Sequence, residues 1–282
     1  MTKLLQKLLN GIATDFSVVN ISEFNDFIKG YIILDELPGD MLYLKREERY
    51  DIKKFFPLAK TAVVCVFQYW NDDYEKRYSD FINKINSPFN YLLKKLPKIN
   101  AEIRNINSNL IARYSLFDDY HKVIRENLEK VIKELKKIDD NIKAKIFVDT
   151  SPIFEKILAC YGGLGFIGRN TLLINKDFGS YLFIGGFLLN VNVNSPKRII
   201  KSHKLCDNCR ICEERCPTKA LYNYRLNPLK CISYWTTHNK DKKIPYEIIK
   251  SSKYLFGCDI CQELCPYNEK IADKTSIFKI PF

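Results

Sequence analysis

The chain has 282 residues, of which 46% are hydrophobic and 28% are charged, and this composition is typical of a folded protein rather than a disordered one. No apolar run reaches the roughly 20 residues that a membrane-spanning helix needs. The stretch MTKLLQKLLNGIATDF (1–16) predicts an amphipathic helix and not a signal peptide. We therefore expect a cytoplasmic protein, and in that reducing compartment clustered cysteines indicate metal ligands rather than disulfides.

The net charge of +12 indicates a polyanionic partner such as a nucleic acid. An alternative is that the many lysine, asparagine and isoleucine residues reflect the composition of the genome. Charge alone therefore leaves nucleic-acid binding open.

Strands and helices alternate over about the first 195 residues, which predicts an α/β domain. TAVVCVFQYW (61–70) predicts a buried strand, YHKVIRENLEKVIKELKKI (120–138) an amphipathic helix, and SYLFIGGFLLNVNV (180–193) one or two further strands. The polar and basic stretch 192–204 is the predicted linker. We accordingly expect an α/β domain over 1–195 and a second domain over 196–282.

The stretch AKIFVDTSP (144–152) predicts a strand that stops at a polar turn, with Asp149 and Thr150 at its C-terminal end. The next helix is predicted over 151–162, with Ser151 as its N-cap and Pro152 at its first position. From these residues alone, Asp149 is a helix-capping aspartate.

Two cysteine motifs dominate the second domain, with Cys231 between them: Cys206-x2-Cys209-x2-Cys212-x3-Cys216-Pro217 and Cys258-x2-Cys261-x3-Cys265-Pro266. These are the spacings of bacterial two-cluster ferredoxins, in which the cysteine before proline binds the other cluster. We therefore predict a ferredoxin-like domain with two 4Fe-4S clusters, the first held by Cys206, Cys209, Cys212 and Cys265, and the second by Cys258, Cys261, Cys216 and Cys231.

Structural zinc is the alternative for these cysteines, although a CxxCxxCxxxCP run fits a four-ligand zinc site poorly. Cys65 and Cys160 lie in apolar stretches and are predicted to be core residues. Two neighbouring clusters can pass electrons, so the α/β domain is expected to hold a further redox cofactor. Composition does not say which cofactor this is.

Several stretches of the chain, in order, resemble one family, the epoxyqueuosine reductases. The similarity extends from about Arg46 to Asn268 and is carried by REERYDIKKFFPLAKTAVV, ARYSLFDDYHKVIRENL, VDTSPIFEKILACYGGLGFIGRNTLLINKDFGSYLFIGGFL, the first cysteine motif, KCISYWT and LFGCDICQELCPYN. A generic ferredoxin has no counterpart of the GLGFIGRNTLL segment.

The resemblance implies a base-off cobalamin held between the two domains. It also implies electron transfer through both clusters to cobalt, and reduction of epoxyqueuosine to queuosine at the wobble position of tRNA. Asp149 matches the family's catalytic acid, and a carboxylic acid that is neutral near pH 7 would need a desolvated pocket. The residues that match the family's cobalamin contacts are Arg49, Ala112, Asp149, Leu173, Ile184 and Ser233.

Other matching residues have two interpretations each. Arg49 could be a solvated surface charge, and His121, in the family's ARYxxxxDYH segment with Arg113 and Asp119, is expected to be structural. The glycines of GGLGFIG could approach the corrin or form a tight turn. Tyr234 and Trp235 could stack a base or pack in the core.

Longer family members continue into helical repeats that help to hold tRNA, whereas this sequence stops at SIFKIPF, so we expect a short form. Such a form could grip tRNA through phosphate contacts with its basic surface. Alternatively, it could be a paralogue that reduces another substrate, as reductive dehalogenases do on a related scaffold, or a ferredoxin-type electron carrier. The expected partners are tRNA and a flavodoxin or ferredoxin system as electron donor. We expect a monomer and no membrane.

Overall fold

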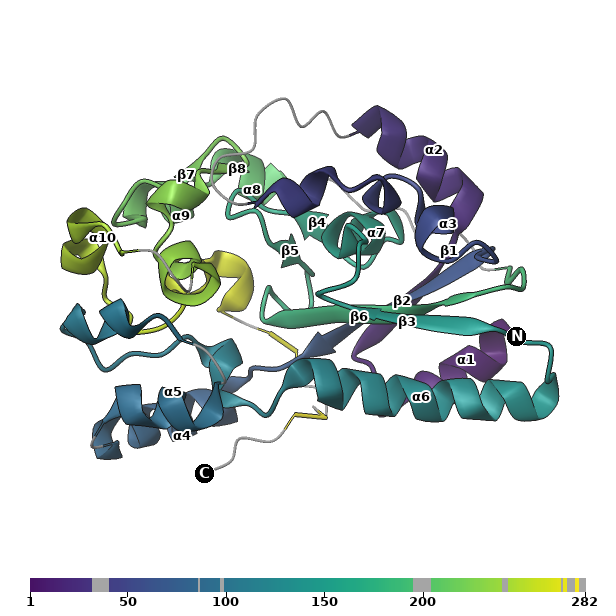
Figure 1. Cartoon of the computed structure of the whole chain (residues 1–282), viewed down its shortest axis with the longest axis horizontal. Coiled ribbons are helices and arrows are strands. Elements are labelled where there is room, and N and C mark those ends of the chain that lie inside the picture. The colour runs from purple at the N-terminus through teal and green to yellow at the C-terminus, as the bar shows by residue number, and fades with distance from the viewer. Residues whose placement is uncertain are drawn as a thin grey trace.

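The computed structural model describes residues 1–31, 41–85, 87–96, 99–194, 204–239, 243–269, 271–272 and 277–278. Its centre is a four-stranded sheet in the order β1-β2-β6-β3, in which all neighbours are antiparallel (Figure 1). Two short hairpins, β4-β5 and β7-β8, lie outside this sheet. The strands are β1 (Asp15–Asn20), β2 (Thr61–Gln68), β3 (Ala144–Val148), β4 (Phe166–Ile167), β5 (Leu173–Ile174), β6 (Leu182–Leu189), β7 (Leu221–Tyr222) and β8 (Arg225–Leu226).

Helices cover both faces of the sheet, with α1 and α6 on one side and α2, α3 and α7 on the other (Figure 1). The α-helices are α1 (Thr2–Leu9), α2 (Ile21–Tyr31), α3 (Ile52–Phe55), α4 (Asp72–Lys84), α5 (Pro88–Lys95), α6 (Tyr120–Ile138), α7 (Glu155–Tyr161), α8 (Lys204–Asn208), α9 (Ile211–Arg215), α10 (Tyr246–Ser251) and α11 (Ile260–Glu263). No helix among the described residues is long and apolar enough to cross a bilayer.

Every residue of β2 is buried, which explains the continuous apolar run that predicted it. Side chains of a strand point alternately to its two faces. Val63, Cys65 and Phe67 pack with α1 and α6, while Val64 and Val66 pack with α2 and α7. A strand between two helical layers therefore needs no polar side, and the expected mixed α/β fold is confirmed.

Two predicted boundaries were wrong. The first helix ends at Leu9, because Gly11 has a positive φ of 76° and the chain then enters β1, which the sequence did not predict. Helix α7 begins at Glu155 rather than at residue 151, and Ser151 is not its N-cap. The carbonyl of Ile153 accepts a 3.1 Å hydrogen bond from Arg49 instead of joining the helix. The predicted region 180–193 is the single strand β6.

The predicted second domain is described over residues 204–239 and 243–269, where it contains short helices and the β7-β8 hairpin, and we call this part the cysteine-rich domain. It joins the α/β domain, residues 1–194, through backbone pairing of Ile111 with Phe256 and a 2.8 Å bond from the Ala112 N–H to the Phe256 carbonyl. Most of the predicted linker lies in residues 195–203, outside the described residues.

Arg113 links these two domains through a buried cluster of ion pairs. Its guanidinium is 6% exposed and forms ion pairs with Glu75 of α4 at 2.7 Å and with Asp259 and Glu263 of the cysteine-rich domain at 3.3 and 2.6 Å. It also lies over the rings of Trp70 and Tyr78. Burial raises the pKa of Asp259 to about 6, while the charge of Arg113 opposes that rise.

Ile277 and Phe278 pack on the α/β core. Phe278 is 1% exposed and lies 4.9 Å from Phe183 and 5.9 Å from Phe117, ring centroid to centroid. The hydroxyl of Tyr74 donates a 2.7 Å hydrogen bond to the carbonyl of Phe278. This part of the predicted second domain, 196–282, therefore packs on the first.

We expect Arg113→Met to lower the free energy of unfolding by about 3–5 kcal/mol, because it leaves the buried carboxylate of Asp259 without its charge partner. Urea denaturation of the cluster-loaded protein measures this. The control is Arg125→Met on the exposed face of α6, which should change stability by no more than about 0.5 kcal/mol. Equal stability of the two variants would contradict the proposed importance of this link.

Candidate functional site

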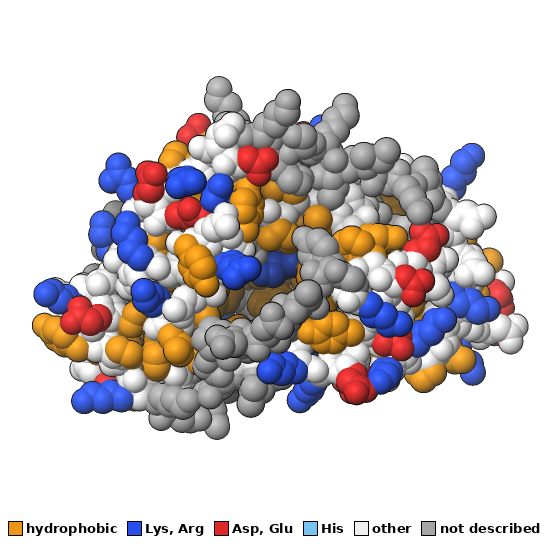
Figure 2. All heavy atoms as spheres, turned by 90° about the horizontal axis from the view of Figure 1, so that it is seen from above, with side chains coloured by type: hydrophobic (Ala, Val, Ile, Leu, Met, Phe, Trp, Pro, Cys, Tyr) orange, Lys and Arg blue, Asp and Glu red, His pale blue; other side chains and the backbone are white. Residues whose placement is uncertain are grey.

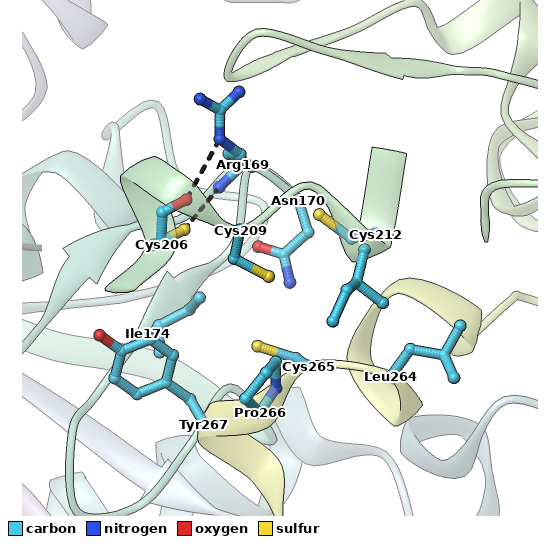
Figure 3. A pocket seen from close by; sticks show the side chains of 11 residues that line it. Arg169, Asn170, Ile174, Cys206, Cys209, Cys212, Leu264, Cys265, Pro266 and Tyr267 are labelled. Atoms are coloured by element: carbon cyan, nitrogen blue, oxygen red, sulfur yellow. Dashed lines mark hydrogen bonds between the residues drawn. The ribbon is translucent and has the colours of Figure 1, made fainter. Parts of the chain in front are cut away.

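The four cysteines assigned to the first cluster line one hollow. Cys206, Cys209, Cys212 and Cys265 surround it, and their sulfur atoms point toward the same space (Figure 3). The first three come from α8, α9 and the turn between them, and Cys265 lies two residues after the end of α11. The structure thus brings together residues 53 positions apart in the sequence (265 − 212), in the grouping that the crossed pattern predicts. We call this the first hollow.

Arg169, from the loop after β4, holds the first cysteine motif. Its backbone N–H donates to Cys206 Sγ at 3.4 Å, and its guanidinium donates to the carbonyls of Cys206 and Asp207 at 3.2 and 2.9 Å. An ion pair with Glu213 at 3.0 Å completes the set. An N–H group that donates to sulfur stabilises a thiolate, which is the form that binds metal.

The other four cysteines, Cys216, Cys231, Cys258 and Cys261, line a second hollow, a cavity of about 400 Å³ between the two domains. The N–H of Ala220 donates to Cys216 Sγ at 3.3 Å. Asn170 lies in the walls of both hollows, and its side-chain amide donates to the Cys261 carbonyl at 3.3 Å. The two hollows are therefore neighbours.

The thiols do not form a compact single-metal site: among the described residues, no group of three or more His, Cys, Asp and Glu side chains is positioned to hold one metal ion. The two cysteines outside the motifs lie elsewhere. Cys65 is fully buried in β2, where burial raises its pKa, and Cys160 is partly buried against the core on the opposite face of the sheet. Their prediction as core residues is confirmed.

A further cavity of about 460 Å³ contains Asp149 and adjoins the second hollow. Met41, Leu182 and Phe183 line both cavities, so the two cavities share a wall. The face in Figure 2 is hollowed near its middle, where hydrophobic and Lys or Arg side chains gather. We refer to the two cavities together as the cleft.

Asp149 lies in a triad of titratable side chains. His121 Nε2 is 3.1 Å from Asp149 Oδ2, and His121 Nδ1 is 2.7 Å from Asp119 Oδ1. The hydrogen bond with His121 lowers the pKa of Asp149, although burial opposes this, and the same bond raises the pKa of His121. In this structure the pKa of Asp149 is thus lowered rather than raised, because His121, 28 residues away in the sequence, hydrogen-bonds its carboxylate.

The backbone of Asp149 has a φ of 52°, in the left-handed region that non-glycine residues rarely adopt. It directly follows β3, and the turn after it carries the chain into α7. Such backbone strain concentrates at functional sites. The turn thus presents the Asp149 carboxylate to the cleft rather than to the N-terminus of α7, and its interpretation as a helix cap is wrong.

Tyr120 and the ring of His121 continue an aromatic stack from the core. Tyr120 lies 4.2 Å from Phe183 at an interplanar angle of 6°, and 4.0 Å from His121. The Tyr120 side chain also hydrogen-bonds Asp149 and helps to lower its pKa. The stack therefore fixes the imidazole that faces Asp149, and the view of His121 as only structural is too narrow.

Of the other predicted cobalamin contacts, three line the cleft and two do not. Arg49 and Ile184 lie in the wall near Asp149, and Ser233 lies in the second hollow. Ala112 and Leu173 are buried within the protein, at 0% and 3% exposure, and line neither cavity. Any contact from these two would need their surroundings to open, and their role remains a prediction.

Arg49 is not the solvated surface charge that the sequence left possible. It is 8% exposed, and its guanidinium donates to the carbonyls of Tyr43 and Ile153 at 3.2 and 3.1 Å. It also lies over the rings of Tyr43 and Phe154. Arg49 therefore joins the segment around Tyr43 to the turn after Asp149.

The glycine loop and the aromatic pair both have structural explanations. A Cβ on Gly165 would lie 2.4 Å from the Ile174 carbonyl oxygen, so the β4-β5 hairpin requires glycine there. Trp235 is 9% exposed and donates a 2.7 Å hydrogen bond to the Leu229 carbonyl, while Tyr234 lines the second hollow. The tight-turn interpretation therefore explains the loop, and core packing explains Trp235.

Four further residues line the cleft that the sequence patterns did not indicate: Tyr43, Tyr120, Glu155 and Lys156. Glu155 and Lys156 stood inside a predicted helix, and nothing in their spacing separated them from ordinary helical residues. Tyr120 lay next to His121 in the family segment, which was the available signal.

Two family models match two separate parts of the chain. Residues 49–150 match the family model described as "Epoxyqueuosine reductase QueG, DUF1730", and residues 205–268 match the "4Fe-4S double cluster binding domain". A curated epoxyqueuosine reductase of Prochlorococcus marinus is 41% identical over 136 residues, which is 48% of this chain and 43% of that protein. The chain thus spans less than half of that relative.

Solved structures share the fold. An epoxyqueuosine reductase in complex with an epoxyqueuosine-modified tRNA stem loop superposes with a TM-score of 0.68 at 24% identity, over 97% of this chain and 66% of that one. A reductive dehalogenase, described with a mechanism for B12-dependent dehalogenation, has a TM-score of 0.52 at 14% identity, over 92% and 30%. The family models and the curated relative confirm the resemblance read from the sequence: the chain is similar to the epoxyqueuosine reductases. The solved structures show that it shares their fold.

Proposed function

We propose that the protein reduces epoxyqueuosine in tRNA to queuosine, with two 4Fe-4S clusters and a cobalamin as its cofactors. The single observation that carries this proposal is that the second cysteine hollow shares wall residues both with the first hollow and with the cavity that contains Asp149. A ferredoxin-type electron carrier needs no such cleft. Removal of the epoxide oxygen as water restores the alkene and consumes two electrons and two protons.

The residues present fit these cofactors. Each hollow offers four thiols and an N–H donor to one of the sulfurs, which suits a cluster held by four thiolates. Cavities of about 400 and 460 Å³ are each of the size used for large organic ligands. Arg49, Ile184 and Ser233 would contact the corrinoid. When bound, these groups supply the low-potential electrons of the reaction.

The protein's own contribution is to move protons and position the substrate. His121 holds a proton against Asp149, and the hydrogen bond between them gives that proton a path to a substrate oxygen in the cleft. Asp119 on the other imidazole nitrogen keeps the ring oriented. Lys and Arg side chains on the face in Figure 2 would contact tRNA phosphates.

The proposal includes a cytoplasmic location, where tRNA is modified, a flavodoxin or ferredoxin system as electron donor, and a monomer. A corrinoid-dependent reductase of another substrate is the second candidate, favoured by the fold shared with the reductive dehalogenase. Single-turnover conversion of epoxyqueuosine-containing RNA by the reduced, reconstituted protein distinguishes the two. Corrinoid uptake without conversion would support the second candidate.

The crossed cluster assignment predicts which cysteine variants behave alike. We expect about eight irons per chain in the anaerobically reconstituted protein. Cys212→Ala and Cys265→Ala should alter one cluster and leave the same residual electron paramagnetic resonance signal, while Cys216→Ala and Cys258→Ala should alter the other. Cys160→Ala is the control and should retain both signals. Zinc in place of iron, or a shared signal for Cys265→Ala and Cys258→Ala, would refute the assignment.

Asp149→Asn should reduce the single-turnover rate by about a hundredfold or more, because the amide cannot relay the proton from His121. The variant should keep its cluster and corrinoid spectra. It should also lower the pKa of His121, measured by NMR, because it removes the hydrogen bond and charge that raise it. Asp140→Asn, at an exposed position, is the control.

The wild-type rate should fall as pH rises through the raised pKa of His121, where the imidazole loses its proton. A rate that stays level through the measured pKa of His121 would exclude it as the proton source. Near-normal turnover by Asp149→Asn would exclude the carboxylate.

A further inference from the structure

Glu155 carries a buried oxygen for which the structure supplies no partner. Its Oε1 atom is inaccessible to solvent and has no hydrogen-bond partner, a state shared among the described residues only by Asn239 Nδ2. Buried polar atoms are almost always hydrogen-bonded, so an exception requires an explanation. Glu155 also lines the part of the cleft that contains Asp149.

The charged groups around Glu155 do not neutralise it. Arg49 is the nearest cation that acts on it, but the guanidinium already donates to the carbonyls of Tyr43 and Ile153. No ion pair of Glu155 is present among the described residues. An isolated buried carboxylate is costly, and such a group tends to keep its proton.

The electrostatics agree with this geometry. Burial, and then the negative charge of Asp149, raise the pKa of Glu155 well above its ordinary value, and the backbone N–H of Asp149 and the charge of Arg49 oppose the rise without cancelling it. The neighbouring Tyr120 is affected by both carboxyl groups and is itself neutral. The two pKa values therefore shift in opposite directions, that of Asp149 downward and that of Glu155 upward.

We propose that Glu155 is a second proton carrier of the cleft, which holds a proton beside Asp149 and passes it to that carboxylate after the first proton has left. This inference rests on the proposed function, because loss of an epoxide oxygen as water breaks two C–O bonds with two electrons and two protons. The electrons come from the low-potential donor through the cofactors. The first proton comes from His121 through Asp149, and the second from the Glu155 carboxyl group.

In this arrangement Glu155 acts through Asp149 and does not touch the substrate, so it is a positioning residue. The two protons would then be stored on two groups next to Asp149: His121, 3.1 Å from its carboxylate, and Glu155, which accepts a hydrogen bond from its backbone N–H. The cleft would need no water between successive transfers. The competing explanation is that Glu155 is ionised and its free oxygen accepts a hydrogen bond from a ligand amide.

Infrared spectroscopy of the cluster-loaded protein without corrinoid or RNA tests the first half of the proposal. We expect the band of a neutral carboxyl group at pH 7 that disappears in Glu155→Gln and persists in Glu129→Gln, a control on the exposed face of α6. Absence of the band from the wild-type protein at pH 7 would overturn the proposal and favour the ligand-amide explanation. This result does not depend on whether RNA is converted.

Thermal denaturation gives an independent measure of the same proton. A raised pKa in the folded state means that the stability from Glu155 is complete below about pH 4 and is lost as pH rises through the raised value. Glu155→Gln should therefore match the wild-type Tm at low pH and exceed it increasingly at higher pH. A Tm difference that does not vary with pH, as expected for Glu129→Gln, would contradict the proposal.

The turnover of Glu155→Gln tests the proton-carrier role itself. With corrinoid affinity unchanged, the single-turnover rate should fall about tenfold or more, and Glu155→Asp should restore part of it because it returns a carboxyl group. Wild-type rates in Glu155→Gln at every pH would overturn the role, even if the neutral carboxyl band is present. Failure of the wild-type protein to convert epoxyqueuosine would refute the proposed function and leave the infrared and thermal results valid.

Discussion

The buried guanidinium of Arg113 is the constraint on which the arrangement of the two domains depends. A charge removed from water is costly unless carboxylates and further hydrogen bonds compensate it. Glu75 supplies one carboxylate from the α/β domain, while Asp259 and Glu263 supply two from the cysteine-rich domain. Compensation is complete only when the domains are docked, so the ion cluster fixes the position of α11 and of the cysteines on either side of it.

That docking determines the order of the functional parts. Asn170 separates the two hollows, and Leu182 and Phe183 of β6 separate the second hollow from the region around Asp149. The parts therefore form a series from the first cysteine group to the proton-carrying triad. A series of this kind suits electrons that enter at one end and are consumed with protons at the other, which is the chemistry we propose.

The sequence predicted the features that local patterns encode. The apolar run of β2, the periodicity of α6 and the cysteine spacings each correspond to what the structure contains, and the family resemblance was confirmed. The predicted start of α7 was wrong because Arg49, about a hundred residues earlier, donates a hydrogen bond to the Ile153 carbonyl.

The protonation states of the site could not be predicted for the same reason. The charge of Asp149 depends on His121, 28 residues away, and the environment of Glu155 depends on how the turn after β3 folds. Motif spacing shows which residue types are present, whereas pKa values depend on which of them meet. The sequence indicated a single catalytic acid, whereas the structure contains three interacting titratable groups, His121, Asp149 and Glu155.

The packing of Phe278 on the core has a consequence for protein engineering. Its ring packs against Phe183. Phe183 stacks on Tyr120, and Tyr120 stacks on the imidazole of His121. A truncation or fusion that displaces Phe278 would loosen the aromatic stack that orients His121, the proposed proton donor. Variants altered at this side of the molecule would therefore react more slowly while retaining their iron, a defect easily mistaken for a fault of the metal centres.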